Sequence, residues 1–182
     1  MTPTILMVPG LRDHVPEHWQ TLLEARLPNA ASVPPLEHDK LSLAARVAAL
    51  DHALAAIDGP VILVAHSAGV MITVHWAQRH ERKIHGALLA APPDFEQPLS
   101  AGYPTQEALA QNGWFPSPRE PLPFPCIVGG SRNDPLARFE RAQEMAREWG
   151  ARFVDLGEVG HLNPASGYGE WPQAETLIRE LL

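Results

Sequence analysis

The sequence contains only one cysteine, Cys126, and therefore cannot form an internal disulfide bond. It also lacks a run of about 18 apolar residues, the length that a helix needs to cross a bilayer. The opening residues, MTPTILMVPG, carry no basic segment, and their apolar run is too short for a signal peptide. We therefore expect a cytoplasmic protein without a membrane association.

Positive charge is scarce as well. Lysine and arginine total 14, against 21 aspartates and glutamates, which gives a formal net charge of -7 at pH 7. This balance argues against a nucleic-acid partner or an anionic membrane surface, and it leaves a small molecule as the expected partner. Cys126 follows Pro125 within an apolar run, so we interpret it as a core residue rather than as a nucleophile.

Apolar residues, in contrast, make up 45% of the 182-residue chain and occur mostly in short runs. This length and composition predict one domain over residues 1–182. Runs typical of strands occupy residues 4–9, 30–34, 61–65, 84–91, 124–129 and 152–156. Helical patterns lie between them, at residues 17–27, 43–57, 68–80, 136–149 and 172–182. This alternation predicts an α/β fold with a mostly parallel sheet of about six strands and helices on both faces.

Residues 92–123 interrupt the alternation of strands and helices. The segment holds eight prolines and the pair Trp114-Phe115. It is long for a plain connection, so we expect it to cover part of the molecule. Further along, the pair Asp134-Pro135 predicts the N-cap and the first turn of the helix over residues 136–149, as Ser42 does the N-cap of the helix over residues 43–57.

Residues 61–70, VILVAHSAGV, join a buried strand to a helical pattern through a serine. The stretch is similar to the nucleophile elbow of α/β-hydrolases, G-x-S-x-G, in which the serine stands on a sharp strand-to-helix turn. Here Ala65 replaces the first glycine. Strand and helix backbones pass closely at that position, and alanine is the next smallest residue after glycine. We therefore interpret Ser67 as a candidate nucleophile.

Three residues are expected at the same edge of the sheet, because the carboxyl ends of parallel strands meet there. Ser67 follows the strand over 61–65, Asp134 follows the strand over 124–129, and His161 follows the strand over 152–156. The chain order of serine, acid and histidine is that of the α/β-hydrolases. A serine hydroxyl needs a neutral imidazole to accept its proton, and the imidazole needs a carboxylate to fix its tautomer.

An oxyanion formed at the substrate carbonyl needs two N–H donors. The backbone N–H of Ala68, directly after the nucleophile, is the first candidate. The second is the N–H of Leu11, in the turn PGLRD after the first strand, where Gly10 permits a tight bend.

Each residue has a simpler explanation when it is taken alone. Ser67 suits a turn, Asp134 suits a helix N-cap, and His161 suits a loop. Asp94, which follows the strand over 84–91, is the rival catalytic acid. His66 lies on the elbow itself and should point away from the hydroxyl, so we do not expect it to be the base.

The stretch His14-Val15-Pro16-Glu17-His18 matches H-x-x-E-H, a zinc-binding pattern that requires a continuous helix. Pro16 resists a helix interior, and no downstream glutamate or histidine is placed as a third ligand. We therefore do not expect a zinc site here.

Five pieces of the sequence resemble the small serine hydrolases of the retinoblastoma-binding protein 9 type. They are VPGLRD with His18-Trp19 after it, VAHSAG, SRNDP, AREWG and GHLNPASGYGEWP, and together they span nearly the whole chain. The resemblance implies a compact alpha/beta-hydrolase fold without a large lid domain, and no metal or organic cofactor. It also implies Ser67, Asp134 and His161 as nucleophile, acid and base.

The family's namesake is associated with retinoblastoma protein through an L-x-C-x-E segment. Residues 124–128 read FPCIV here, without the leucine and the glutamate, so that partner is not expected. We expect instead a small ester, thioester or activated amide, bound in a shallow pocket with Trp19, Trp114, Phe115 and Trp171 as candidate walls. A non-catalytic binding protein on the same scaffold, and a haloperoxidase- or lyase-like reaction, stay open as alternatives.

Overall fold

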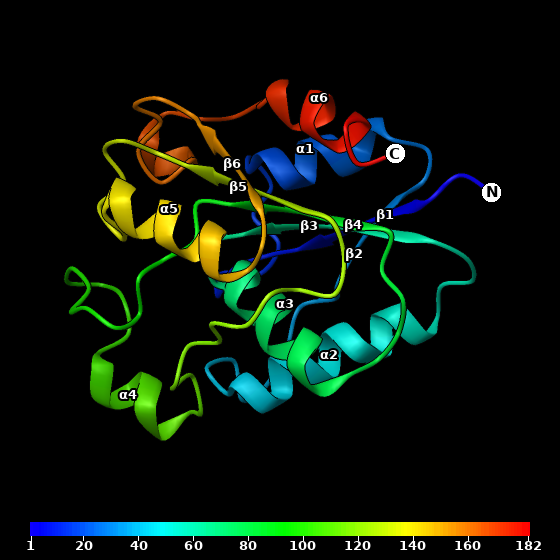
Figure 1. Cartoon of the computed structure of the whole chain (residues 1–182). Coiled ribbons are helices and arrows are strands. Elements are labelled where there is room, and N and C mark those ends of the chain that lie inside the picture. Colours follow the sequence, from blue (N-terminus) through cyan, green and yellow to red (C-terminus); the bar gives the residue numbers. More distant parts are fainter.

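The computed structural model describes residues 1–182 and is built on one six-stranded sheet (Figure 1). The strands are β1 (Thr4–Val8), β2 (Ala30–Ser32), β3 (Val61–His66), β4 (Gly86–Ala90), β5 (Cys126–Gly130) and β6 (Arg152–Asp155). They lie in the order β2-β1-β3-β4-β5-β6, and every neighbouring pair is parallel. The predicted strands are therefore confirmed, and the sheet is wholly rather than mostly parallel.

The central strand β3 explains why the sheet is covered on both faces. Successive side chains of a strand point to opposite sides, and all six residues of β3 are buried. Val61, Leu63 and Ala65 belong to one hydrophobic cluster, whereas Ile62 and Val64 belong to the other. A strand without a polar face can only lie between two layers of helices.

Six helices form these layers. They are α1 (Trp19–Arg26), α2 (Leu43–Ala55), α3 (Ala68–Arg79), α4 (Gln106–Gln111), α5 (Phe139–Glu148) and α6 (Gln173–Arg179). Helices α1 and α6 cover one face of the sheet, and α2, α3 and α5 pack against the other (Figure 1). None of the helices is both long and apolar enough to cross a membrane.

The sequence patterns placed most helices correctly but misplaced the start of α5. Asp134 was expected to be its N-cap, yet α5 begins at Phe139 with Arg138 as N-cap. The Asp134 carboxylate instead accepts the backbone N–H of Leu136 at 2.9 Å, which forms a separate turn before the helix. Helix α4 lies within the proline-rich segment and was not predicted, although Thr105 caps it through its hydroxyl.

The two edges of the sheet differ in what they carry. Strands β3, β5 and β6 run into the segments that hold Ser67, Asp134 and His161 at the carboxyl edge. Both termini lie at the opposite, amino edge, because β1 begins at Thr4 and the carbonyl of Leu182 lies 3.3 Å from His85 Nε2, just before β4 (Figure 1). Cys126 is buried at the start of β5, as expected, and burial raises the pKa of its thiol to about 11.

Candidate active site

Ser67 lies at the turn between β3 and α3 in a backbone conformation that side chains rarely adopt. Its φ is 56° and its ψ is -127°. Its N–H donates to the carbonyl of Ala90 on β4 at 3.1 Å, and its own carbonyl accepts the N–H of Val70 at 2.9 Å. These bonds hold the turn between a central strand and a buried helix. Strain of this kind persists where the surrounding structure compensates for it, and it is common at functional sites.

Gly69 allows the elbow to approach β1. A Cβ at this position would lie 2.0 Å from the carbonyl oxygen of Val8, so only glycine fits. Gly10 is different, because a Cβ there would meet its nearest atom, the Cβ of Ser67, at an ordinary 3.5 Å. The positive φ of the PGLRD turn, 55°, belongs to Asp13 instead. Gly10 therefore permits the bend, as expected, but neither its φ nor its contacts require a glycine at this position.

The structure brings Ser67, His161 and Asp134 together. Ser67 Oγ lies 2.7 Å from His161 Nε2, and His161 Nδ1 lies 3.0 Å from each carboxylate oxygen of Asp134. The side chains of His161 and Asp134 are 4% and 3% exposed, so water competes little for their contact. The geometry is that of a hydroxyl, an imidazole and a carboxylate in series, with the proton on Nδ1 facing the carboxylate.

Two further histidines extend this group behind the nucleophile. The N–H of Gln20 donates to His18 Nδ1, so His18 carries its proton on Nε2 and donates to His66 Nδ1 at 3.2 Å. His66 then donates from Nε2 to the carbonyl oxygen of His161 at 2.8 Å. His66 thus holds the backbone of His161 rather than facing the hydroxyl, in agreement with its predicted exclusion as the base.

His18 and His66 are both neutral near pH 7. Burial, followed by the charge of His161, lowers the pKa of His18 to about 4. Burial is also the largest cause that lowers the pKa of His66 well below its usual value. No pattern in the sequence indicated that these two rings would meet, because they are 48 residues apart.

Two backbone N–H groups are free to receive an oxyanion beside Ser67. Ala68 is the first residue of α3, so its N–H has no acceptor within the helix. The N–H of Leu11 donates no hydrogen bond within the chain. Both residues line the cavity above Ser67, as the predicted oxyanion hole requires.

The turn that carries Leu11 is held by Arg46 of α2, which the sequence analysis missed. Its guanidinium pairs with the carboxylate of Asp13, and it donates to the carbonyls of Lys40 at 2.7 Å and Leu11 at 3.2 Å. The N–H of Asp13 in turn donates to the carbonyl of Gly10 at 3.0 Å. That carbonyl belongs to the same peptide plane as the N–H of Leu11, so the bond from Asp13 fixes the direction of the candidate oxyanion donor, and Arg46 supports it by holding the Asp13 carboxylate.

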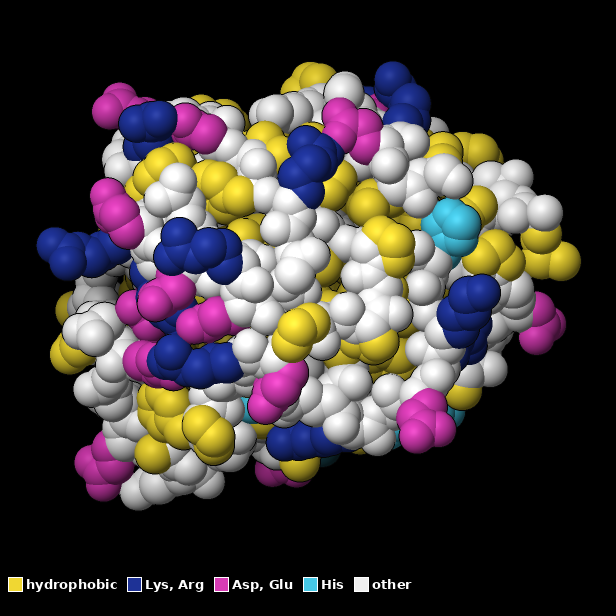
Figure 2. Space-filling view, in the orientation of Figure 1, with side chains coloured by type: hydrophobic (Ala, Val, Ile, Leu, Met, Phe, Trp, Pro, Cys, Tyr) yellow, Lys and Arg dark blue, Asp and Glu magenta, His cyan; other side chains and the backbone are white.

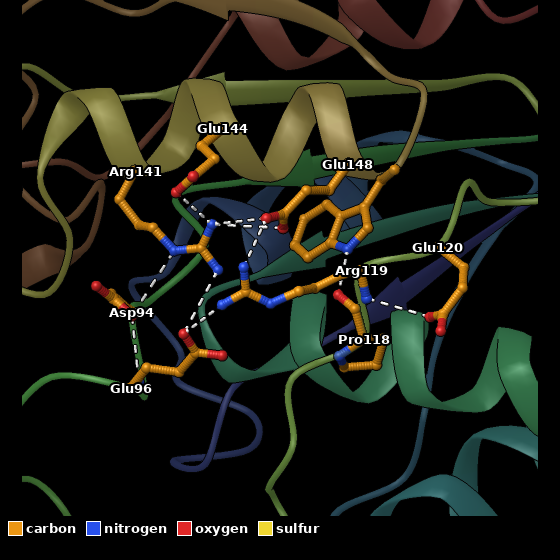
Figure 3. A network of polar contacts seen from close by, with 9 residues as sticks. Asp94, Glu96, Pro118, Arg119, Glu120, Arg141, Glu144 and Glu148 are labelled. Carbon is orange, nitrogen blue, oxygen red and sulfur yellow. Dashed lines mark hydrogen bonds and ion pairs between the residues drawn. The ribbon is translucent and has the colours of Figure 1, made fainter.

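The rival acid, Asp94, lies in a different environment. Its carboxylate accepts the N–H of Glu96 at 3.1 Å and faces the guanidinium of Arg141 at 3.9 Å (Figure 3). Burial is the main cause that raises its pKa. Asp94 makes no contact with His161, whose Nδ1 is occupied by Asp134. The geometry thus favours Asp134 as the acid.

Asp94 belongs to an ion-pair network that ties the segment 92–123 to α5 (Figure 3). Arg119 pairs with Glu96 at 2.7 Å and with Glu148 at 3.1 Å, and Arg141 bridges to the same two glutamates. Figure 2 shows acidic and basic side chains interleaved on the side of the molecule where α5 lies. The network therefore anchors the segment to α5 near both of the segment's ends.

A cavity of about 440 Å³ opens above Ser67, a size that suits a small molecule. Its apolar walls come from the turn after β1, from Leu41, from the proline-rich segment, from Leu136 and from the stretch after His161. They are Leu11, Val15, Leu41, Phe95, Leu99, Tyr103, Pro104, Leu136, Pro164 and Ala165. The segment 92–123 does cover the site, but through residues that the sequence analysis did not single out.

The four aromatic residues expected as pocket walls lie elsewhere. Trp19 and Trp114 are 1% and 0% exposed in the hydrophobic core, Trp171 packs edge-on against Trp19, and Phe115 is partly buried against the larger hydrophobic cluster. The indole of Trp114 donates to the carbonyl of Leu41 at 2.7 Å, which satisfies its polar atom. None of the four lines the cavity, so this prediction is wrong.

The zinc-like pattern does not form a helix. Helix α1 begins at Trp19 with His18 as its N-cap, so His14 and Glu17 precede the helix and are exposed. The His18 ring is engaged with His66. Two histidines on one helical face, as the zinc pattern requires, are not available here.

Comparisons with known proteins show the family of this chain and its fold. The family model described as serine hydrolase matches residues 5–180. Among solved structures, a protein from Pectobacterium atrosepticum described as a YdeN-like hydrolase is 32% identical, with a TM-score of 0.84 over 99% of this chain and 90% of that one. None of the curated proteins compared gives a significant match.

More distant structures share the fold. The ydeN gene product of B. subtilis is 16% identical, with a TM-score of 0.72 over 99% of this chain and 98% of that one. Alpha/beta hydrolase domain-containing protein 10 from mouse is 14% identical, with a TM-score of 0.71 over 100% of this chain and 92% of that one. At these identities the likeness concerns the fold alone.

Proposed function

Because this chain belongs to the serine hydrolase family and has the alpha/beta-hydrolase fold, we propose that it hydrolyses small esters, thioesters or activated amides through an acyl-enzyme on Ser67. The observation that carries the proposal is the 2.7 Å contact between Ser67 Oγ and His161 Nε2, with both oxygens of Asp134 at 3.0 Å from Nδ1. A nucleophile and a base within hydrogen-bond reach, with the base oriented by a third group, are the requirement for this chemistry.

In the acylation step Ser67 Oγ attacks the substrate carbonyl and gives its proton to His161 Nε2. The carboxylate of Asp134 stabilises the imidazolium that forms. The oxyanion accepts hydrogen bonds from the N–H groups of Leu11 and Ala68, two residues that line the cavity and whose N–H groups donate no other hydrogen bond within the chain. His161 then protonates the leaving group.

In the deacylation step water enters the cavity and attacks the acyl-enzyme, with His161 again as the base. The neutral state of His18 and His66 supports this cycle, because a second cation beside the catalytic imidazole would oppose its protonation. The backbone contact from His66 keeps the imidazole in place while its charge changes.

The substrate proposal is a small acyl group, because the cavity is about 440 Å³ and is walled mainly by apolar side chains. We also propose that, within its family, this chain is of the retinoblastoma-binding protein 9 type. This proposal rests on the sequence motifs around Ser67, Asp134 and His161. No retinoblastoma-protein partner is proposed.

The test is the intact mass of the protein after exposure to a fluorophosphonate probe. We expect one adduct on the wild type and none on Ser67→Ala. Ser100→Ala removes an exposed serine that does not line the cavity, so this control should label as the wild type does. A folded wild type that takes no adduct would contradict the proposal and favour a non-catalytic binding protein.

A further inference from the structure

The mouth of the cavity carries more positive than negative charge. Of the 22 residues that line it, Arg12 and Lys40 are cations and Asp13 is the one carboxylate. Asp134 lies behind the imidazole of His161 and does not line the cavity. The remaining lining residues are apolar or neutral, apart from His161 when it is protonated during the reaction.

The charge of the Asp13 carboxylate does not neutralise Arg12 and Lys40, because a third cation, Arg46, also pairs with it. Its Oδ1 pairs with Arg46, which is 5% exposed and lies behind the turn, and its Oδ2 lies 3.6 Å from Lys40 Nζ. Lys40 and Arg46 thus share a single carboxylate, whereas Arg12 pairs with none. Together these three cations and the one carboxylate leave two net positive charges in and behind the turn that borders the cavity. The whole chain has a formal net charge of -7, so this site is an exception on an acidic protein.

Arg12 is the cation that is available to a ligand. Its side chain is exposed, and it forms no ion pair and no hydrogen bond with another side chain. It follows Leu11 directly, so it projects from the same turn as the candidate oxyanion donor. A guanidinium binds a carboxylate through two parallel N–H bonds, which an ammonium cannot do.

We propose that the substrate carries a carboxylate, which Arg12 binds at the mouth with Lys40 beside it, while the apolar walls hold the rest of the molecule. This inference rests on the proposed hydrolase function and adds a charge class to it. A single carboxylate suits the site, because Lys40 already shares Asp13 and only the charge of Arg12 is unshared. The surplus charge also attracts an anion from a distance.

The test compares esters that differ only in charge. On the leaving-group side the pair is 4-acetoxybenzoate and 4-acetoxybenzamide. On the acyl side it is phenyl 4-carboxybenzoate and phenyl 4-carbamoylbenzoate. In each pair a carboxylate is replaced by a carboxamide of similar shape. We expect the wild type to prefer the anionic member of at least one pair by about tenfold in kcat/KM, and the preference to shrink as sodium chloride is raised.

Arg12→Gln should bring that preference close to one. The matched controls are Arg138→Gln and Lys83→Gln, which remove the same charge from exposed positions outside this cavity and should keep the preference. Equal kcat/KM for both members of both pairs would overturn the inference while leaving the hydrolase proposal intact. A wild type without a Ser67 adduct and without ester hydrolysis would overturn both.

A second measurement covers the case in which Ser67 labels but none of the four esters is cleaved. The rate of fluorophosphonate labelling is then followed in the presence of 4-hydroxybenzoate or 4-hydroxybenzamide. The inference requires stronger protection by the anion in the wild type, and loss of that difference in Arg12→Gln. Equal protection by the two compounds would overturn it.

Discussion

At the scale of single residues, the strand-to-helix turn at Ser67 depends on the absence of a side chain at Gly69. Ser67 is held at a φ of 56°, and the turn is closed only because α3 approaches β1 at Gly69. A methyl group there would overlap the backbone oxygen of Val8 at 2.0 Å. A backbone oxygen in a central strand cannot move aside as the end of a flexible side chain can.

Gly69→Ala is therefore expected to lower the free energy of unfolding by about 3 kcal/mol, at the upper end of the usual cost of overpacking. Gly10→Ala is the matched control, since its new Cβ would find ordinary contacts at 3.5 Å or more and its φ is not positive. Urea denaturation of both variants measures the difference. Equal stabilities would contradict the close approach at Gly69.

The choice of acid is also decided by single residues. Asp134→Asn is expected to lower kcat/KM by a factor on the order of 10⁴, because an amide holds the imidazole in the wrong tautomer. Asn keeps an oxygen for the N–H of Leu136, so the turn itself should persist. Asp94→Asn should stay close to the wild type, since Asp94 faces Arg141 and not His161. Steady-state hydrolysis of a phenyl ester compares the two, and the reverse ranking would show that Asp94 is the acid.

Chain order made Ser67, Asp134 and His161 predictable, because parallel strands bring their carboxyl ends to one edge whatever their sequence separation. The direction of a large side chain is not encoded in the same way. Trp114 stands in a segment that covers the site, yet its indole turns to the core, where Leu41 accepts its N–H. Arg46 lies within the helix predicted over residues 43–57, and only tertiary packing shows what its guanidinium binds.

At the scale of elements, α2 controls the turn after β1. Arg46 is anchored on a helix of 13 residues whose N-cap Ser42 accepts the N–H of Ala45. From this fixed position its guanidinium holds both the carboxylate and a carbonyl of the turn that offers the N–H of Leu11. A helix is a firmer support than a loop for a donor that must be aimed before the reaction.

Arg46→Lys is expected to keep the charge beside Asp13 but to lose the bonds to the carbonyls of Lys40 and Leu11. The turn should then loosen, and kcat should fall by about tenfold, less than the loss of an oxyanion donor itself. KM should change little, because the ground-state carbonyl depends less on this donor than the oxyanion does. A rise in KM with an unchanged kcat would contradict this role for Arg46.

At the scale of the whole molecule, three buried histidines make stability depend on pH. Burial lowers the pKa of His18 and of His75 to about 4, and that of His66 well below its usual value of 6.5. Between pH 6.5 and about 4 the unfolded chain binds protons at these rings that the folded chain does not. Stability is therefore fully present above pH 6.5 and is lost as the pH falls through this range.

Near pH 5 we expect unfolding to take up about three protons through these rings, and each of them contributes about 1.4 kcal/mol to the free energy of unfolding per pH unit. Urea denaturation between pH 4.5 and 7 measures this slope. His75→Gln should make the slope shallower by about one proton, whereas His38→Gln, at an exposed position, is the control. An unchanged slope in His75→Gln would contradict the prediction.

The placement of both termini at the amino edge of the sheet bears on how the protein can be handled. Ser67 and its cavity open at the opposite, carboxyl edge, with the full length of β3 between. A polypeptide tag, a fused partner or a tether to a solid support joined at either end would therefore leave from the far side of the molecule. Substrate would reach the cavity of an immobilised enzyme from open solution, whichever end is attached.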